Sequence, residues 1–375
     1  MMLSLKAGGR LTDVITLQRG FDLPEAQRQS GSIPVVASTG VVGSHSEKKV
    51  DGPGVVIGRS GSIGGGQYIA EDFWPLNTTL WVKDFKNHNP RFIYYLLRNI
   101  DFLPFNAGAG VPTLNRNHLD SLIVPLFGLD QEHRIADILS AYDDLIENNR
   151  RRTALLEEFA RLLYREWFVS LRFPDHEHTR IVDGVPEGWE RKTLGDLCTD
   201  VRDTAMPEHL EPDTPYIGLE HMPRRSIALS EWGYAEEVTS TKHRFRAGEI
   251  LFGKIRPYFH KVGIAFVDGV ASSDAIVIRP LAEELCCLVL MVVSSDPFVA
   301  STVQDMREGS KMPRADWKLM KQYHVSVPSH GLLSSFNTTI QPIVDQLRTL
   351  TSKSHKLRVA RDLLLPRLMN GEIAV

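Results

Sequence analysis

Two long segments of the chain carry apolar side chains at alternating spacings of three and four residues. In the first, the residues on this seam are Ile135, Ile138, Tyr142, Leu145, Asn149, Arg152, Leu156, Phe159 and Leu163. In the second they are Phe336, Ile340, Ile343, Leu347, Leu350, Ser354, Leu357, Arg361 and Leu364. This spacing puts one seam along an α-helix and is typical of coiled coils. Each segment predicts a helix of about 35–40 residues, or about 50–60 Å.

The two helical patterns superpose with an offset of 205 residues, so that position 135 corresponds to 340 and position 159 to 364. Weaker correspondences precede the helices, which pair 11–14 with 194–197, 55–59 with 250–254, and 111–112 with 312–313. The sequence therefore indicates an internal duplication. Because two similar domains alternate with the two helices, an antiparallel helix pair gives the chain a pseudo-twofold axis. Two unrelated surface helices are the alternative.

The segments before the helices alternate short apolar runs with glycine, proline, asparagine and serine clusters, which predicts short strands and tight turns. One helix is predicted over 92–100, and the apolar run 285–293 fits a buried helix or strand. We expect an α+β fold of two mostly-β domains with an antiparallel coiled coil. The predicted parts are a first domain at 1–128, a helix at 129–170, a linker at 171–185, a second domain at 186–330 and a helix at 331–375.

The ends of the two helices carry different signals. Asp130 can cap the first helix. In the second, Pro342 falls early in the seam, and proline removes a backbone donor and bends a helix unless it lies in the first turn. The sequence leaves open where the second helix begins. It can begin before Pro342 and include Phe336 and Ile340, or it can begin near Gln341 and leave both residues outside.

Composition excludes several classes of protein. The 375 residues include 43 Lys and Arg against 46 Asp and Glu, a net charge of −3, so bulk charge does not attract nucleic acid. Three cysteines form no disulfide framework. No apolar run reaches the length of a membrane span and the start lacks a signal sequence, so we expect a cytoplasmic protein without a membrane partner.

No recognisable active site is present. The sequence lacks a phosphate-binding loop, a nucleophile elbow, a zinc-protease motif and the Asn-Pro-Pro-aromatic motif of amino-methylating enzymes. The glycine-rich run at 58–66 fits a tight hairpin better than a nucleotide cradle. The two histidines at 176 and 178 have too few neighbours for a metal site. We therefore expect no enzyme, no metal site and no cofactor in this chain.

The remaining pattern, of clustered basic residues with aromatic residues among them, is suited to binding nucleic acid. Residues 242–261 hold six basic residues against one acid, with Tyr258, Phe259 and His260 interleaved. Arginine and lysine suit phosphates and guanine edges, and asparagine suits adenine edges. The DNA-contacting residues that we predict are Arg59, Ser60, Ser62, Asn115, Arg116 and Asn117 in the first domain, and Lys254, Arg256, Tyr258, Lys261, Lys311 and Arg314 in the second.

Six stretches resemble one family. They are DQEHRIADILSAYDDLIENNRRR at 130–152, REWFVSLRFP at 165–174, GWERKTLGDL at 188–197, LLLPRLMNGEI at 363–373, GRSGSIG at 58–64 and GVPTLNRNHLDSLIVPL at 110–126. In this order, duplicated around two long helices, they resemble the specificity subunit of type I restriction–modification systems. The second helix departs from the pattern, because it lacks the Gln131–Glu132 pair of the first.

The resemblance implies a non-catalytic specificity subunit. Its two target-recognition domains each read one half of a bipartite, asymmetric site in double-stranded DNA, and its helices set the spacing of the halves. It implies two methylase subunits, which use S-adenosylmethionine to methylate adenine, and two restriction motor-nuclease subunits, which use ATP and magnesium. The alternatives are a coiled-coil scaffold without a DNA-reading role and an enzyme with an unfamiliar motif.

Overall fold

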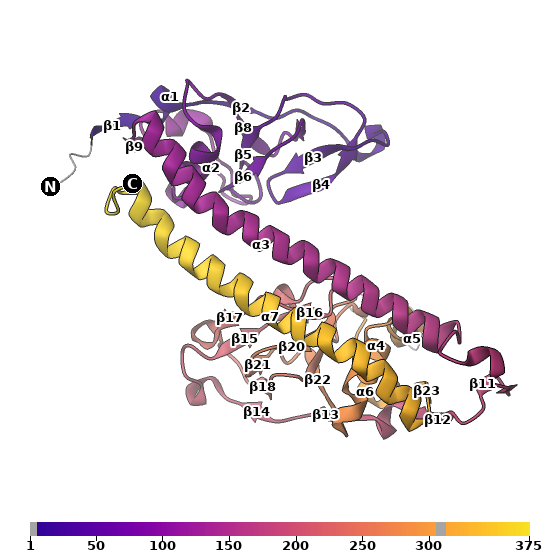
Figure 1. Ribbon diagram of the computed structural model, residues 1–375. Coiled ribbons are helices and arrows are strands. Elements are labelled where there is room, and N and C mark those ends of the chain that lie inside the picture. The colour runs from indigo at the N-terminus through magenta and orange to yellow at the C-terminus, as the bar shows by residue number, and fades with distance from the viewer. Residues whose placement is uncertain (1–5, 305–312) are drawn as a thin grey trace. The chain divides into compact units, whose positions relative to one another are not determined.

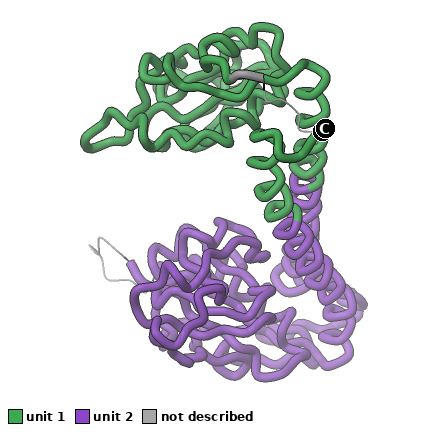
Figure 2. The backbone as a smooth tube through the Cα atoms, turned by 90° about the vertical axis from the view of Figure 1, so that its left-hand side faces the viewer, with its two compact units in different colours: residues 1–145, 357–375 green, residues 146–356 purple. Residues whose placement is uncertain are grey.

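The computed structural model describes residues 6–304 and 313–375. The chain divides into two compact units, which Figure 2 colours separately. Unit 1 comprises residues 1–145 and 357–375, and unit 2 comprises residues 146–356. The long helices α3 (Leu129–Tyr164) and α7 (His330–Met369) each contribute one part to each unit.

Unit 1 contains a four-stranded sheet and a three-stranded sheet, together with the helix α2 (Pro90–Arg98) (Figure 1). Its four-stranded antiparallel sheet has the order β2 (Thr16–Arg19), β8 (Thr79–Asp84), β5 (Gly54–Gly58) and β6 (Gly64–Ile69). Its three-stranded sheet has the order β4 (Gly40–His45), β3 (Ile33–Ala37) and β7 (Trp74–Pro75), with β3 and β7 parallel. A separate antiparallel pair joins β1 (Lys6–Arg10) to β9 (Ile123–Leu126), just before α3.

The core of unit 1 lies where α2 (Pro90–Arg98) packs between the four-stranded sheet and the long helices. Val55 and Ile57 of β5, Phe92 and Leu96 of α2, and Leu139 of α3 belong to one buried cluster. Residues of α7 complete this cluster from the other end of the chain, namely Leu365, Leu368 and Met369. The predicted helix over 92–100 is therefore present, displaced by two residues, and its apolar face explains its position.

Unit 2 has the same arrangement, with more strands in each of its two main sheets. Its first sheet has the order β13 (Cys198–Val201), β22 (Ala275–Pro280), β19 (Ile250–Gly253), β20 (Val262–Ala265) and β16 (Ala228–Leu229). Its second sheet has the order β14 (Thr204–Ala205), β18 (Lys242–Phe245), β21 (Gly269–Ala271), β15 (Pro215–Ile217) and β17 (Gly233–Tyr234). The antiparallel pair of β12 (Glu190–Thr193) and β23 (His324–Val327) precedes α7, as β1 and β9 precede α3.

The correspondence extends to individual hydrogen bonds. Asp13 accepts from the backbone N–H of Arg10 at 3.2 Å where α1 (Leu11–Val14) follows β1. Asp196 accepts from the backbone N–H of Thr193 at 2.8 Å, at the same place after β12. The core of unit 2 combines Phe252 of β19 with α4 (Cys286–Val293), α5 (Asp296–Gln304) and the apolar face of α7. The repeat inferred from the sequence is thus a structural duplication.

The two long helices pair in antiparallel fashion within each unit (Figure 1). In unit 2, the side-chain amide of Asn149 donates to the hydroxyl of Ser354 at 3.2 Å, and the ring of Trp167, just beyond α3, lies 5.7 Å from that of Phe336. In unit 1, the carboxylate of Asp143 pairs with Arg361. From one contact to the next, the residue number rises on the side of α3 as it falls on the side of α7, which is the pattern of an antiparallel pair. Asn149 and Ser354 are separated by 205 residues, the offset of the repeat, so residues at equivalent positions of the two helices are in contact.

The seam predicted for the first helix is wrong at every second position. Ile138, Leu145 and Phe159 are 37%, 51% and 51% exposed. The buried and half-buried face of α3 instead comprises Ile135, Leu139, Tyr142, Ile146, Asn149, Thr153, Leu156, Ala160 and Leu163. In α7, Ile343, Leu347 and Leu350 are buried and Leu357 and Leu364 are half-buried. Each exposed residue has an apolar or small neighbour one position further along that takes the inward place.

The starts of the two long helices also differ from expectation. α3 begins at Leu129, so Asp130 lies in its first turn rather than capping it, while the side-chain oxygen of Gln131 accepts from the N–H of Gly128 at 3.3 Å. α7 begins at His330 and continues through Pro342. Phe336 and Ile340 are helical and fully buried in the unit 2 core.

The apolar run at 285–293 forms α4, whose residues from Cys287 to Val293 are buried. Within the described ranges, no single helix is long and apolar enough to cross a membrane. Residues 283–303 reach that composition only as a helix pair bent by 63°.

Candidate nucleic-acid interface

In unit 1, the glycine-rich turn after β5 holds Arg59 in a fixed place. A Cβ atom on Gly58 would lie 1.9 Å from the carbonyl oxygen of Ser62, and Gly61 has a φ of +86°, so both positions require glycine. The backbone N–H of Arg59 donates to the carbonyl of Thr78 at 2.8 Å, and its guanidinium donates to the carbonyl of Asn77 at 3.1 Å. These contacts hold both the backbone and the guanidinium end of Arg59.

A second loop is hydrogen-bonded to this turn. The N–H of Leu114 donates to the carbonyl of Arg59 at 2.7 Å, and the N–H of Gly61 donates to the carbonyl of Pro112 at 3.0 Å. Ser60 forms an isolated bridge with Thr113. The structure therefore brings two segments of predicted residues together, and a hollow is lined by Arg59, Asn115 and Arg116.

The predicted residues of unit 1 differ in what they can offer. Asn115 uses its side-chain oxygen to accept from the N–H of Asn117 at 3.1 Å, which caps the short helix at Arg116–Leu119. Arg116 and Asn117 are exposed, as is Ser62. Asn117 lines a neighbouring hollow together with Lys86. The sequence-based prediction missed Arg19, which lines the same hollow as Arg59 and Arg116.

Unit 2 builds the same pair of loops at equivalent positions. The N–H of Ala315 donates to the carbonyl of Lys254 at 2.9 Å, as Leu114 does to Arg59. The N–H of Lys254 donates to the carbonyl of Asp274 at 2.7 Å. Lys254 and Arg59 therefore occupy corresponding sites, each directly after an inner strand of its sheet. A positive charge stands at the same point of both repeats.

The rest of the unit 2 loop is unlike its counterpart. It carries Arg256, Tyr258 and Phe259, whereas residues 60–66 of unit 1 include no basic or aromatic side chain. The guanidinium of Arg224 lies 4.0 Å from the ring centroid of Phe259, that of Arg256 lies 5.9 Å away, and Tyr258 is 51% exposed. Arginine and exposed aromatic rings on one loop suit both phosphates and bases. Arg314 is exposed but forms an ion pair with Asp274 at 3.5 Å.

Part of the predicted basic cluster at 242–261 points inward. Lys242 is buried and donates to the carbonyl and hydroxyl of Ser240, at 2.9 Å and 2.7 Å. Lys261 donates to the carbonyl of Leu219, and burial lowers the pKa of both lysines. Arg244 lies on β18, in the other sheet from Lys254. Lys311 lies outside the described residues.

A helix cap in unit 2 corresponds to the Asn115 cap of unit 1. Asp316 accepts from the N–H of Lys318 at 2.9 Å and caps α6 (Trp317–Met320). The exposed Lys318 thus corresponds to Asn117, and the sequence-based prediction missed it. The offset that relates 111–112 to 312–313 could have located it. Among the described residues, no group of three or more His, Cys, Asp or Glu side chains could hold a metal ion.

Comparison with known proteins shows which proteins the chain is similar to. Residues 8–158 match the family model described as "Type I restriction modification DNA specificity domain". The type I restriction enzyme MjaIX specificity subunit of Methanocaldococcus jannaschii is 21% identical over 336 residues, covering 82% of this chain and 75% of that protein. The EcoDI specificity subunit of Escherichia coli is 26% identical over 213 residues, covering 49% of this chain and 47% of that protein. A crystal structure of the type I system S subunit from M. genitalium has a TM-score of 0.57 at 16% identity, covering 98% of each chain.

The fold is that of the S subunits of type I restriction–modification systems, with two mostly-β units and an antiparallel pair of long helices. Residues 8–158 match the model of the type I restriction–modification DNA specificity domain, and over most of its length the chain is similar to a type I specificity subunit. The resemblance predicted from the sequence is confirmed.

Proposed function

We propose that the chain reads a bipartite, asymmetric site in double-stranded DNA, one half with each repeat. The observation that carries this proposal is the pair of equivalent loops. Arg59 and Lys254 are held by the same backbone hydrogen bonds, while the residues around them differ between the repeats. Equivalent placement of a positive charge, with different neighbours in each repeat, is what two readers of different half-sites require.

The chain contributes recognition and leaves the chemistry to other subunits. We propose that it positions two methylase subunits, which bring S-adenosylmethionine for adenine methylation, and two motor-nuclease subunits, which bring ATP and magnesium. Net charge of −3 and a basic surface limited to short loops support tight DNA binding only within such a complex. Affinity of the complex should fall steeply as salt rises, because phosphate contacts release counterions.

The test is to express the chain with its methylase subunit and to sequence the methylated adenines. Arg59→Ala should relax or abolish recognition of one half of the modified site, and Lys254→Ala should do so for the other half. Arg172→Ala is the matched control, because Arg172 is an exposed arginine outside both loop pairs and pairs with Glu166. If both loop variants leave the modified sequence unchanged, the chain is a coiled-coil scaffold without a DNA-reading role.

A further inference from the structure

The recognition loop of unit 2 is held in a conformation that its own residues disfavour. Arg256 and His260, at its two ends, have φ values of 49° and 55°. Arg225, in the loop packed beside it, has a φ of 56°. Left-handed backbone is uncommon at residues other than glycine, and it persists where surrounding contacts enforce it. In unit 1 the corresponding positions are Gly61 and Gly65 instead.

His260 is the anchor that enforces this conformation. Its side chain is only 7% exposed, although it follows directly after the loop that carries Tyr258. One ring nitrogen, Nε2, lies 2.8 Å from the carbonyl oxygen of Ser294, at the end of α4. The other, Nδ1, lies 3.4 Å from the carboxylate of Asp296, at the start of α5. The loop is thereby tied to the junction of two core helices.

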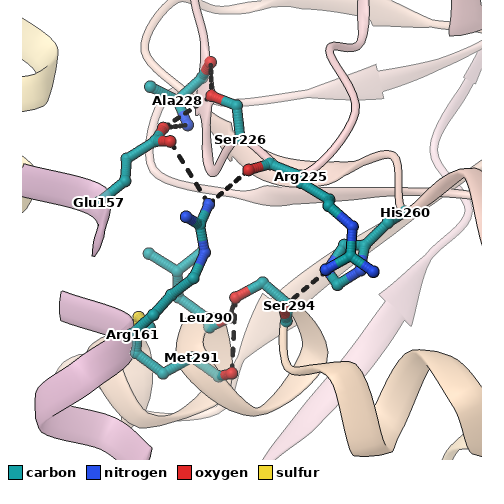
Figure 3. A network of polar contacts seen from close by, with 9 residues as sticks. All are labelled: Glu157, Arg161, Arg225, Ser226, Ala228, His260, Leu290, Met291 and Ser294. Carbon is teal, nitrogen blue, oxygen red and sulfur yellow. Dashed lines mark hydrogen bonds and ion pairs between the residues drawn. The ribbon is translucent and has the colours of Figure 1, made fainter. Parts of the chain in front are cut away.

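A second set of contacts continues from His260 to α3 (Figure 3). The carbonyl of His260 accepts from the N–H of Arg225 at 2.9 Å, and the guanidinium of Arg225 donates to Asp296 at 2.8 Å. Arg161 of α3 donates to the carbonyl of Arg225 at 2.6 Å. The buried carboxylate of Glu157, also on α3, accepts from Ser226 at 2.7 Å and from the N–H of Ala228 at 2.8 Å.

These contacts connect the end of the loop to two different parts of the core of unit 2. His260 fixes its end against α4 and α5, and the 225–228 segment connects that end to α3. None of the anchoring side-chain contacts involves Arg256 or Tyr258, which are the side chains we expect to meet DNA. The anchor therefore determines where the reading side chains lie without taking part in the reading.

We propose that His260 is a positioning residue for the second half-site, acting through Ser294, Asp296 and Arg225. This inference rests on the proposed function, since it assumes that the loop reads DNA. It assigns sequence discrimination to a buried side chain that does not touch the DNA. Because the anchor belongs to unit 2 alone, its loss should affect only the half-site read by Lys254 and Arg256.

The experiment compares His260→Gly with His178→Ala in the complex with methylase. Glycine supplies the left-handed backbone but removes the ring, so the variant separates anchoring from strain. His178 is an exposed histidine in the segment before β12 and serves as the control. The readouts are the rate of methylation on targets with one base pair changed in either half, and hydrogen exchange in residues 254–260.

In the His260→Gly complex, discrimination should fall about tenfold or more for the second half-site, the size of one lost base-pair preference, and stay within about twofold for the first. Hydrogen exchange in residues 254–260 should accelerate. Equal losses in both half-sites would show a general structural defect, and unchanged discrimination in the second half-site would also overturn the proposal. If His260→Gly does not fold, Asp296→Ala, at a side chain that is 69% exposed, removes the carboxylate beside both His260 and Arg225 and provides the same test.

The two proposals fail in different ways. If Lys254→Ala and Arg256→Ala leave the second half-site unchanged, the proposed function of the loop is wrong, whatever His260 does. If those variants change it and His260→Gly does not, only the positioning role is wrong.

Discussion

Replacing Arg361 tests how the helix pair is held together in unit 1. Arg361 lies on the inward face of α7 and is 7% exposed. Its guanidinium pairs with Asp143 of α3 and donates to Asp362 at 2.9 Å. Asp143 also accepts from the hydroxyl of Tyr95 on α2, at 2.7 Å, and the Asp143 side chain is 21% exposed. A charge pair between a buried arginine and a half-buried aspartate, together with the Tyr95 hydrogen bond, therefore connects α2, α3 and α7.

Removing one member of a buried ion pair costs about 3–5 kcal/mol, because the other charge is left without a partner. Since Asp143 retains some solvent and the Tyr95 hydrogen bond, we expect about 3 kcal/mol for Arg361→Leu. In a unit of this size that corresponds to a fall of about 6–12 °C in the melting temperature. The double variant Arg361→Leu with Asp143→Asn should recover most of the loss, because the amide oxygen still accepts from Tyr95.

The assay is urea unfolding followed by hydrogen exchange in the peptides of α2 and of α3 up to residue 145, which report unit 1 separately. The four proteins of the double-mutant cycle are the parent, the two single variants and the double variant. A cost below about 1 kcal/mol for Arg361→Leu, or no coupling with Asp143, would refute the reasoning.

Three further predictions concern other parts of the fold. Burial raises the pKa of Cys198 and of Cys287 to about 12, so both thiols should resist alkylation at pH 8–9 until the protein is unfolded in urea; rapid labelling of the folded protein would contradict their burial. Cysteines substituted at Asn149 and Ser354 should form a disulfide on mild oxidation, as mass spectrometry can show, whereas a parallel or separated helix pair would leave them reduced. The buried carboxylate of Glu132 accepts from His88 at 2.6 Å and from the N–H of Asn89 at 2.9 Å. Glu132→Ala should therefore lower the unfolding free energy of unit 1 by about 1–3 kcal/mol and speed hydrogen exchange in α2. Hydrogen exchange unchanged from the parent protein would contradict this role.

The sequence predicted the duplication and the second seam better than the first seam, for a physical reason. In α3 two neighbouring residues compete for the inward place at several turns, as Ile138 does with Leu139 and Phe159 with Ala160. Spacing alone cannot choose between adjacent apolar residues. In unit 1, Leu139 faces α2 and the sheet, whose position follows from tertiary packing.

Pro342 shows how packing overrides a local signal. A proline inside a helix costs about 3 kcal/mol, since it removes one backbone hydrogen bond and crowds the preceding turn. The turns around it bury Phe336, Ile340, Ile343 and Val344 in the core of unit 2. Burying four such side chains contributes more than the proline costs, at about 1.5–3 kcal/mol each, so the helix continues.

The arrangement of the candidate interface depends on strand pairing and on hydrogen bonds between distant loops, which cannot be predicted from the sequence alone. The run at 242–261 is continuous in sequence, but β18 and β19 belong to different sheets, and Lys242 and Lys261 are used internally. The hydrogen bonds that join Lys254 to Ala315, and Arg59 to Leu114, link segments about 55–60 residues apart. Such contacts arise from the fold, although the repeat offsets pointed to the same residues.

The central claim is that each repeat carries its own reader of a DNA half-site. The most direct measurement replaces residues 8–128 with residues 191–329, so that the chain carries the second reader twice, and sequences the adenines methylated by its complex. We predict a modified site in which both halves have the sequence read by the second repeat. A site identical to that of the parent chain, or one that retains the first half-sequence, would contradict the account.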